Sequence, residues 1–237
     1  MNGNFGLAHF WAQGDGVLHA IAIALFLMSM ASGYIILGKA VAQLRSRAAI
    51  TRAIQSFWDA GSRSDALKAI RAEDRTGFFA AIAEDALWAA QACEDKSTGG
   101  IGTGMDAGEI IGRTLQQSTA LAQARVERGL TFLASVGSTA PFIGLLGTVW
   151  GIYHALIGLS GGSQMALDRV AGPVGEALIM TAAGLFVAIP AALAYNAFTR
   201  ANRLLLAQLD RFAHNLHAYL VADVRLDHSA RAGTAIS

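Results

Sequence analysis

The sequence has little charge and almost no cysteine. Only 15% of its 237 residues are charged and 54% are hydrophobic, whereas about 25% of the residues of a soluble domain are charged. This composition excludes an ordinary soluble domain and predicts a membrane protein. The single cysteine, Cys93, excludes an internal disulfide and a thiolate metal cluster. We interpret it as a reduced core thiol facing the cytosol.

The sequence also lacks a nucleotide-binding motif. Residues 96–108 (KSTGGIGTGMDAG) are rich in glycine, but no Gly-Lys-Ser/Thr follows at P-loop spacing and no apolar strand precedes them. We expect a flexible loop there, with no ATP site, no metal and no cofactor. The net charge of +1 gives no reason to expect a nucleic-acid partner. Any work that this protein does must draw on another source of energy, such as an ion gradient.

Three segments are long and apolar enough to span a lipid bilayer, which takes about 20 helical residues. We place these transmembrane helices at residues 17–37, 132–159 and 174–198. No Lys or Arg precedes the first segment and Lys39 follows it, the reverse of a secretory signal. The first segment is therefore expected to be a retained anchor.

The distribution of cations predicts the orientation. Twelve of the 18 Lys and Arg residues lie between the first and second segments, five follow the third, and only Arg169 lies on the other side. The positive-inside rule then places residues 1–16 and 160–173 in the periplasm. It places residues 38–131 and 199–237 in the cytoplasm.

The predicted cytoplasmic regions have apolar residues at helical spacing. One stripe runs toward the second span and another follows the third; their residues are Ile111, Leu115, Ala122, Val126 and Leu130, and Leu205, Leu209, Phe212, Leu216 and Leu220. We expect a continuous helix over residues 107–159, and a third span that continues past the membrane. The predicted fold is an all-α membrane protein with three transmembrane helices and long helical cytoplasmic extensions that form a bundle.

The second and third spans contain small residues and prolines suited to close helix packing. These candidate packing residues are Pro141, Gly144, Gly147, Gly151, Gly184 and Pro190. Because such faces exceed what three helices in one chain can satisfy, we expect a homo-oligomer. The hydroxyl of Thr148 either bonds within its own helix or faces a wet path, and the sequence leaves both open.

Glu176 begins a hydrophobic run with no other charge until Arg200. A carboxylate at membrane depth costs about 2.5–3.5 kcal/mol, and usually marks an ion path, a proton relay or an interhelix contact. The alternative is a glutamate at the headgroup level. Thr181 lies five residues further on, about 140° around an ideal helix, so the two residues do not share one narrow face.

At these residues the sequence resembles a known family. The stretch STAPFIGLLGTVWGIYHALIGL, followed by GEALIMTAAGLFVAIPAALAYNAF, is similar to the paired second and third spans of the MotA/TolQ/ExbB proton-channel family. Within it, the ending LDRFAHNLHAYL favours the ExbB branch over the TolQ branch. Three spans rather than four argue against a flagellar stator of the MotA type.

The resemblance implies a fold, partners and a site. ExbB-like proteins form pentamers in the bacterial inner membrane around the single helices of an ExbD dimer, whose aspartate carries protons, and the complex energises TonB for outer-membrane uptake. The resemblance also implies that this chain is a proton-channel motor subunit in a lipid bilayer, with no enzyme activity. Its pore-lining polar residues would be Thr148, Glu176 and Thr181. His154 falls outside that set.

Two alternatives to this function stay open. One is a TolQ-type motor for envelope maintenance, which would use the same chemistry with other partners. The other is a non-conducting membrane scaffold, in which Glu176 only locks helices together.

Overall fold

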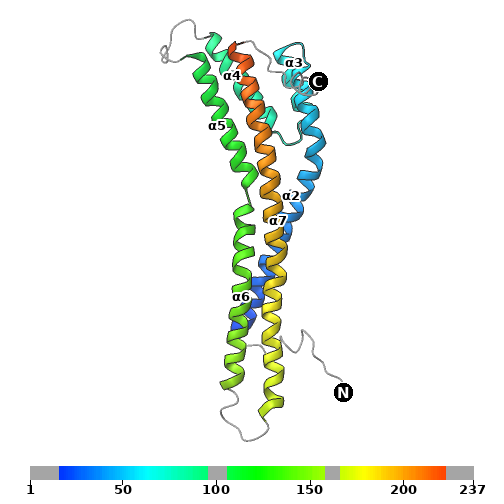
Figure 1. Ribbon diagram of the computed structural model, residues 1–237, viewed down its shortest axis with the longest axis vertical. Coiled ribbons are helices and arrows are strands. Elements are labelled where there is room, and N and C mark those ends of the chain that lie inside the picture. The colour runs from blue at the N-terminus through cyan, green and yellow to red at the C-terminus, as the bar shows by residue number, and fades with distance from the viewer. Residues whose placement is uncertain (1–15, 96–105, 158–165, 223–237) are drawn as a thin grey trace, which may run out of the picture. The chain divides into compact units, whose positions relative to one another are not determined.

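The computed structural model describes residues 16–95, 106–157 and 166–222, and these residues are helical apart from short connections (Figure 1). The helices are α2 (Gly16–Trp58), α3 (Arg63–Glu73), α4 (Phe78–Asp95), α5 (Ala107–Glu127), α6 (Leu130–Ile157) and α7 (Ala166–Ala222). The described residues contain no strand, so the predicted all-α class is confirmed. The expected loop at residues 96–105 lies outside the described residues.

Three helical stretches are long and apolar enough to cross a membrane, as predicted. They are Gly16–Arg45, Ala107–Ile157 and Ala177–Ala222. Helix α7 begins at Ala166, within a segment that the sequence analysis assigned to a loop. Large apolar side chains such as Phe26, Phe142 and Phe186 are exposed on these helices, as expected for surfaces that meet lipid or another apolar helix.

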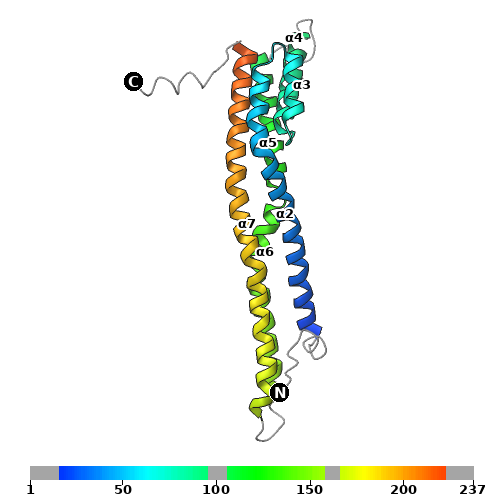
Figure 2. The ribbon, with the colours of Figure 1, turned by 90° about the vertical axis from the view of Figure 1, so that its right-hand side faces the viewer.

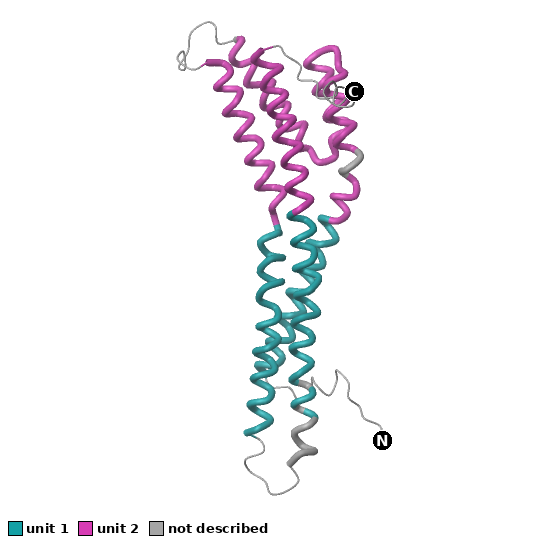
Figure 3. The backbone as a smooth tube through the Cα atoms, viewed as in Figure 1, with its two compact units in different colours: residues 1–39, 129–199 teal, residues 40–128, 200–237 magenta. Residues whose placement is uncertain are grey.

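The chain divides into two compact units (Figure 3). Unit 1 comprises residues 1–39 and 129–199, and unit 2 comprises residues 40–128 and 200–237. Helices α2 and α7 each contribute residues to both units. Unit 1 contains the candidate pore residues of the sequence analysis.

In unit 2 the end of α2, α3, α4, α5 and the last part of α7 lie side by side (Figure 2). Their buried side chains form a hydrophobic core. Phe212 is central to it: its ring lies 5.2 Å from that of Phe57 and 5.6 Å from that of Phe79, both edge to face. The two predicted apolar stripes meet there, since Ile111 and Leu216 belong to the same buried cluster. The expected core thiol, that of Cys93, is only half-buried.

The turn between α3 and α4 is organised by a buried carboxylate. Asp74 is 8% exposed and accepts hydrogen bonds from the backbone N–H and the hydroxyl of Thr76 and from the backbone N–H of Ala80. Gly77 follows with a φ of 70°, a conformation that glycine adopts without steric strain. These bonds satisfy backbone donors at the start of α4 and hold α3 against it.

The prediction of one continuous helix over residues 107–159 is wrong. Helix α5 ends at Glu127 and α6 begins at Leu130. The break occurs because Gly129 has a φ of 83°, in the left-handed region, which ends a right-handed helix. The apolar stripe continues across the break, so hydrophobic periodicity alone did not reveal it.

We predict that Gly129→Ala destabilises the protein. A side chain in the left-handed region costs about 1–2 kcal/mol, and a Cβ here would also lie 3.3 Å from the Ile35 side chain. Gly38→Ala in α2 is the matched control, because no atom lies within 4 Å of its added Cβ. Thermal unfolding followed by circular dichroism should show a lower midpoint for Gly129→Ala only. Equal midpoints for the two variants would contradict the assigned backbone conformation.

Candidate functional site

Helices α6 and α7 touch backbone to backbone at one point in unit 1. A Cβ on Gly144 would lie 2.5 Å from the carbonyl oxygen of Met180, and a Cβ on Gly184 would lie 2.6 Å from that of Ala140. Neither distance is possible for a real side chain, because carbon and oxygen in contact sit about 3.3 Å apart or more. Glycine at both positions is therefore required for this approach.

The glycine face of α6 continues away from this point. A Cβ on Gly147 would lie 2.9 Å from the Met180 Cβ, and one on Gly151 would lie 2.8 Å from the Ala177 Cβ. Helix α2 also approaches this face, with Ile21 3.4 Å from the Gly147 position. The face is thus filled by helices of the same chain. It gives no independent reason for a homo-oligomer, contrary to the argument from sequence.

The sequence analysis did not include one packing residue of this interface, Gly137. A Cβ on Gly137 would lie 3.1–3.2 Å from the Cβ, Cα and N atoms of Ala192. Gly137, Gly144 and Gly151 are seven residues apart, a spacing that keeps residues on nearly one helix face. That spacing is the signal by which Gly137 could have been found.

Thr148 and Thr181 lie beside the glycine contact and bond to each other. The hydroxyl of Thr181 donates to Thr148 Oγ1 at 3.4 Å, and the hydroxyl of Thr148 donates to the carbonyl oxygen of Leu145 at 2.7 Å. Thr148 is 5% exposed, whereas Thr181 is half-buried. Of the two alternatives left open for Thr148, the described structure has the bond within its own helix.

Glu176 belongs to α7, five residues before Thr181 in an uninterrupted helix. The placement of its side chain lies outside what the structure describes. The next residue, Ala177, is 1% exposed and packs against Gly151. The structure therefore brings Thr148 and Thr181 together and fixes the helical register of Glu176 relative to them.

The two prolines lie within continuous helices. Pro141 is half-buried in α6 and Pro190 is exposed in α7. Proline has no N–H for the carbonyl four residues before it, so Pro190 frees the carbonyl oxygen of Phe186. Transmembrane helices tolerate such an interruption when neighbouring groups satisfy the carbonyl.

His154 is tied to its own helix. Its Nδ1 lies 3.1 Å from the carbonyl oxygen of Trp150, and its ring lies 4.6 Å from the Trp150 ring. These contacts fit an interfacial histidine packed on tryptophan.

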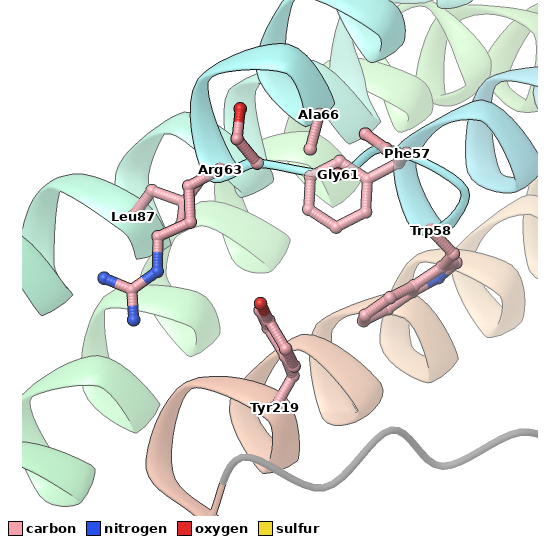
Figure 4. Close-up of a pocket in the computed structure, with 9 residues that line it drawn as sticks. Phe57, Trp58, Gly61, Arg63, Ala66, Leu87 and Tyr219 are labelled. Carbon is pink, nitrogen blue, oxygen red and sulfur yellow. The ribbon is translucent and has the colours of Figure 1, made fainter.

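A small cavity in unit 2 is the other candidate for a site (Figure 4). Its volume is about 40 Å³ and its lining includes Trp58, Arg63 and Tyr219, a space of about one water molecule. The Arg63 guanidinium donates to Glu94 Oε1 at 2.9 Å, and this bond is the main cause of a raised pKa of Arg63. The charged group is already paired, so the cavity has no evident ligand.

We predict that Gly144→Ala disrupts unit 1. The added methyl would meet the Met180 carbonyl, so α6 and α7 would have to separate, and overpacking of this kind costs about 1–3 kcal/mol. Gly33→Ala in α2 is the control, since its Cβ meets nothing within 4 Å. The thermal midpoint of the purified protein should fall for Gly144→Ala alone. A variant as stable as the control would show that the two helices do not approach this closely.

Comparison with known proteins gives a consistent family. The family model of the MotA/TolQ/ExbB proton channel family matches residues 78–211, which include Thr148, Glu176 and Thr181. The chain is 43% identical over 218 residues to the biopolymer transport protein ExbB of Xanthomonas campestris pv. campestris, covering 91% of this chain and 86% of that protein.

Two further relatives distinguish branches of the family. The biopolymer transport protein ExbB of Neisseria meningitidis is 39% identical over 209 residues, covering 88% of this chain and 94% of that protein. The Tol-Pal system protein TolQ of Pseudomonas aeruginosa is 43% identical over only 112 residues, 47% of this chain and 48% of that protein. The family model matches more than half of the chain and the ExbB matches cover most of it, and the chain therefore belongs to the MotA/TolQ/ExbB proton channel family.

Proposed function

We propose that this chain is an ExbB-like motor subunit of the bacterial inner membrane. It couples the proton motive force through an ExbD-like single-span protein to a TonB-like protein for energy-dependent uptake across the outer membrane. The observation that carries this proposal is the extent of similarity: the match to ExbB proteins spans 91% of the chain, whereas the match to TolQ spans 47%. The ExbB role is therefore favoured over a TolQ role in envelope maintenance.

The proton path runs along Thr181 rather than between α6 and α7. The glycine contacts at Gly144 and Gly184 leave no room for water at the point where these helices meet. Thr148 is buried behind Thr181, whose side chain remains partly exposed. Glu176, five residues earlier on α7, adds a carboxylate to the same helix. Glu176 lies about 140° from Thr181 around an ideal helix, so the two residues would face different neighbours around a path that is otherwise apolar.

The path requires helices from outside the chain. An exposed flank of one helix cannot exclude lipid from a proton carrier, because unpaired polar groups in hydrocarbon cost several kcal/mol each. A homo-oligomeric ring, a pentamer by family resemblance, would enclose the path around the partner's helix. The partner supplies the titrating acid, and proton flow biases its helices between discrete arrangements. This mechanism is mechanical coupling and includes no enzymatic reaction.

We predict that Glu176→Gln abolishes TonB-dependent uptake and leaves the oligomer intact. The amide keeps the size and hydrogen bonding of the carboxyl group but cannot ionise. Uptake of a TonB-dependent nutrient and oligomer content by native mass spectrometry should be measured on the same cells. Glu176→Ala serves as the second variant.

The scaffold alternative gives the opposite order. If Glu176 only locks helices together, Glu176→Gln should be nearly silent and Glu176→Ala should disrupt the oligomer. Full uptake with Glu176→Gln would overturn the assignment of Glu176 to the proton path. If the Glu176 variants kept normal uptake but showed a Tol-Pal envelope defect, the result would instead indicate the TolQ role.

The proposed orientation has a separate test. Single cysteines at Ser46 and Ser163, in a protein whose Cys93 is replaced by Ser, should react with a membrane-impermeant thiol reagent from opposite sides. The reason is the 17 to 1 division of Lys and Arg between the two sides. Labelling of both cysteines from the periplasm would contradict a cytoplasmic location of residues 38–131.

A further inference from the structure

The part of α7 that belongs to unit 2 has two chemically different faces. One face packs into the core of this unit, where Leu209, Phe212 and Leu216 are at most 2% exposed. The opposite face is exposed and carries the three arginines of this part of the helix. We call it the basic face, and its residues are Arg200, Arg203, Leu204, Ala207, Arg211 and His214. In Figure 2 this part of α7, coloured orange to red, lies at the edge of unit 2.

The helical register sets the direction of the basic face. Residues of an α-helix are about 100° apart around its axis, so Arg200, Ala207 and Arg211 lie within an arc of about 40°. Leu209 lies about 180° from Arg200 on the same helix, and its complete burial turns the basic face away from the core. Arg200 and Arg211 are also about 16 Å apart along the axis. The basic face is therefore a long and narrow surface.

The positive charge of the basic face is not neutralised by the described part of the chain. None of its three arginines forms an ion pair with a described carboxylate. Elsewhere in unit 2, Arg63 pairs with Glu94 at 2.9 Å and Arg113 pairs with Glu109 at 2.6 Å. Between residues 200 and 222 the sequence contains one acidic residue, Asp210. Clustered arginines with free guanidinium groups are a common recognition surface for acidic motifs.

We propose that the basic face is a docking surface for an acidic peptide segment of another protein. Carboxylates of the segment pair with the three arginines, since a guanidinium group can donate two parallel hydrogen bonds to one carboxylate. Leu204, which is 62% exposed between these cations, contacts the apolar part of the segment. This interaction is additional to the proposed function and does not depend on the proton path.

An anionic lipid surface is the main competing occupant. Arg200 and Arg203 directly follow the third predicted span, at the level where lipid headgroups lie in the predicted topology. The headgroup region on each side of the hydrocarbon is about 5–8 Å thick. Arg211 lies about 16 Å beyond Arg200 along the helix, so the basic face extends past a lipid surface. A peptide segment can follow its whole length.

The test is the fluorescence anisotropy of a labelled peptide of eight glutamates, titrated with the full-length protein in a neutral detergent. Arg200→Gln, Arg203→Gln and Arg211→Gln together remove three charges from the basic face and change no core residue. We expect the wild type to bind the peptide and the triple variant to bind it about tenfold more weakly, because each exposed ion pair contributes little by itself. Absence of binding to the wild type, or equal binding to both proteins, would overturn the inference.

A matched triple variant controls for net charge. Lys68→Gln, Arg75→Gln and Arg125→Gln remove three exposed cations from other parts of unit 2. Their combined effect on the dissociation constant should stay within about twofold, because a local docking surface depends on the position of the charges. If this variant lost as much affinity as the first, the peptide would be responding to net charge alone and the basic face would not be a docking site.

Arg211→Gln alone separates a peptide from a lipid. A segment that follows the whole basic face should bind this variant about twofold more weakly, and should still bind the wild type in nanodiscs that contain phosphatidylglycerol. If phosphatidylglycerol abolished peptide binding and Arg211→Gln had no effect, the occupant would be anionic lipid and the inference would be wrong.

A second copy of this chain is a weaker candidate for the occupant. In unit 2 the carboxylates of Glu84, Glu94 and Glu109 already pair with arginines of their own chain. Dissociation of the wild-type oligomer by the glutamate peptide, measured by mass photometry, would show a contact between copies and contradict the inference. None of these measurements requires proton flow, so their failure would leave the proposed function intact.

Discussion

The contact of Gly144 with Gly184 is the constraint on which unit 1 depends. At this point two helices meet with no side chain between them, and a methyl group on either would overlap a carbonyl oxygen of the other. Lipid tails are as apolar as leucine, so association of helices in a bilayer relies on such close packing rather than on the hydrophobic effect. The neighbouring glycines and alanines extend this contact along α6 and α7.

The contact of Gly144 with Gly184 also determines which of the two nearby threonine hydroxyls stays partly exposed. Because the interface is closed at the glycines, Thr148 cannot face water across it and bonds to Leu145 within its helix. Thr181, at the edge of the interface, remains partly exposed and is tied to Thr148. The close packing of α6 against α7 thus places the Thr181 hydroxyl beside Thr148. Unit 2 has a different basis, an aromatic and aliphatic core around Phe212.

Much of the fold could be predicted from the sequence because hydrophobic length and helical periodicity are local signals. The three apolar stretches and the stripes of unit 2 followed from them. The break at Gly129 did not, because the stripe runs through it and a positive φ leaves no mark on hydrophobic periodicity. The partner of the glycine face of α6 was also misjudged. Residue spacing shows that one face of a helix carries small residues, but not which helix packs against that face.

The sequence predicted which residues belong to the candidate site, but not how they are arranged in space. The carboxylate within an apolar run singled out Glu176, and the family resemblance implied that Thr148, Thr181 and Glu176 together line the pore. The bond between the two threonines depends on the pairing of α6 with α7, which joins residues 33 apart, and no local pattern encodes it. The direction of that bond depends in turn on a backbone carbonyl.

The central claim, a proton path along Thr181, is tested most directly by proton flux. The complex of this chain with its single-span partner would be reconstituted in liposomes under an imposed pH gradient and membrane potential. We expect measurable flux for the wild type and a strong reduction for Thr181→Val, with the same oligomer content in both. Equal flux through the two complexes would contradict a path along Thr181.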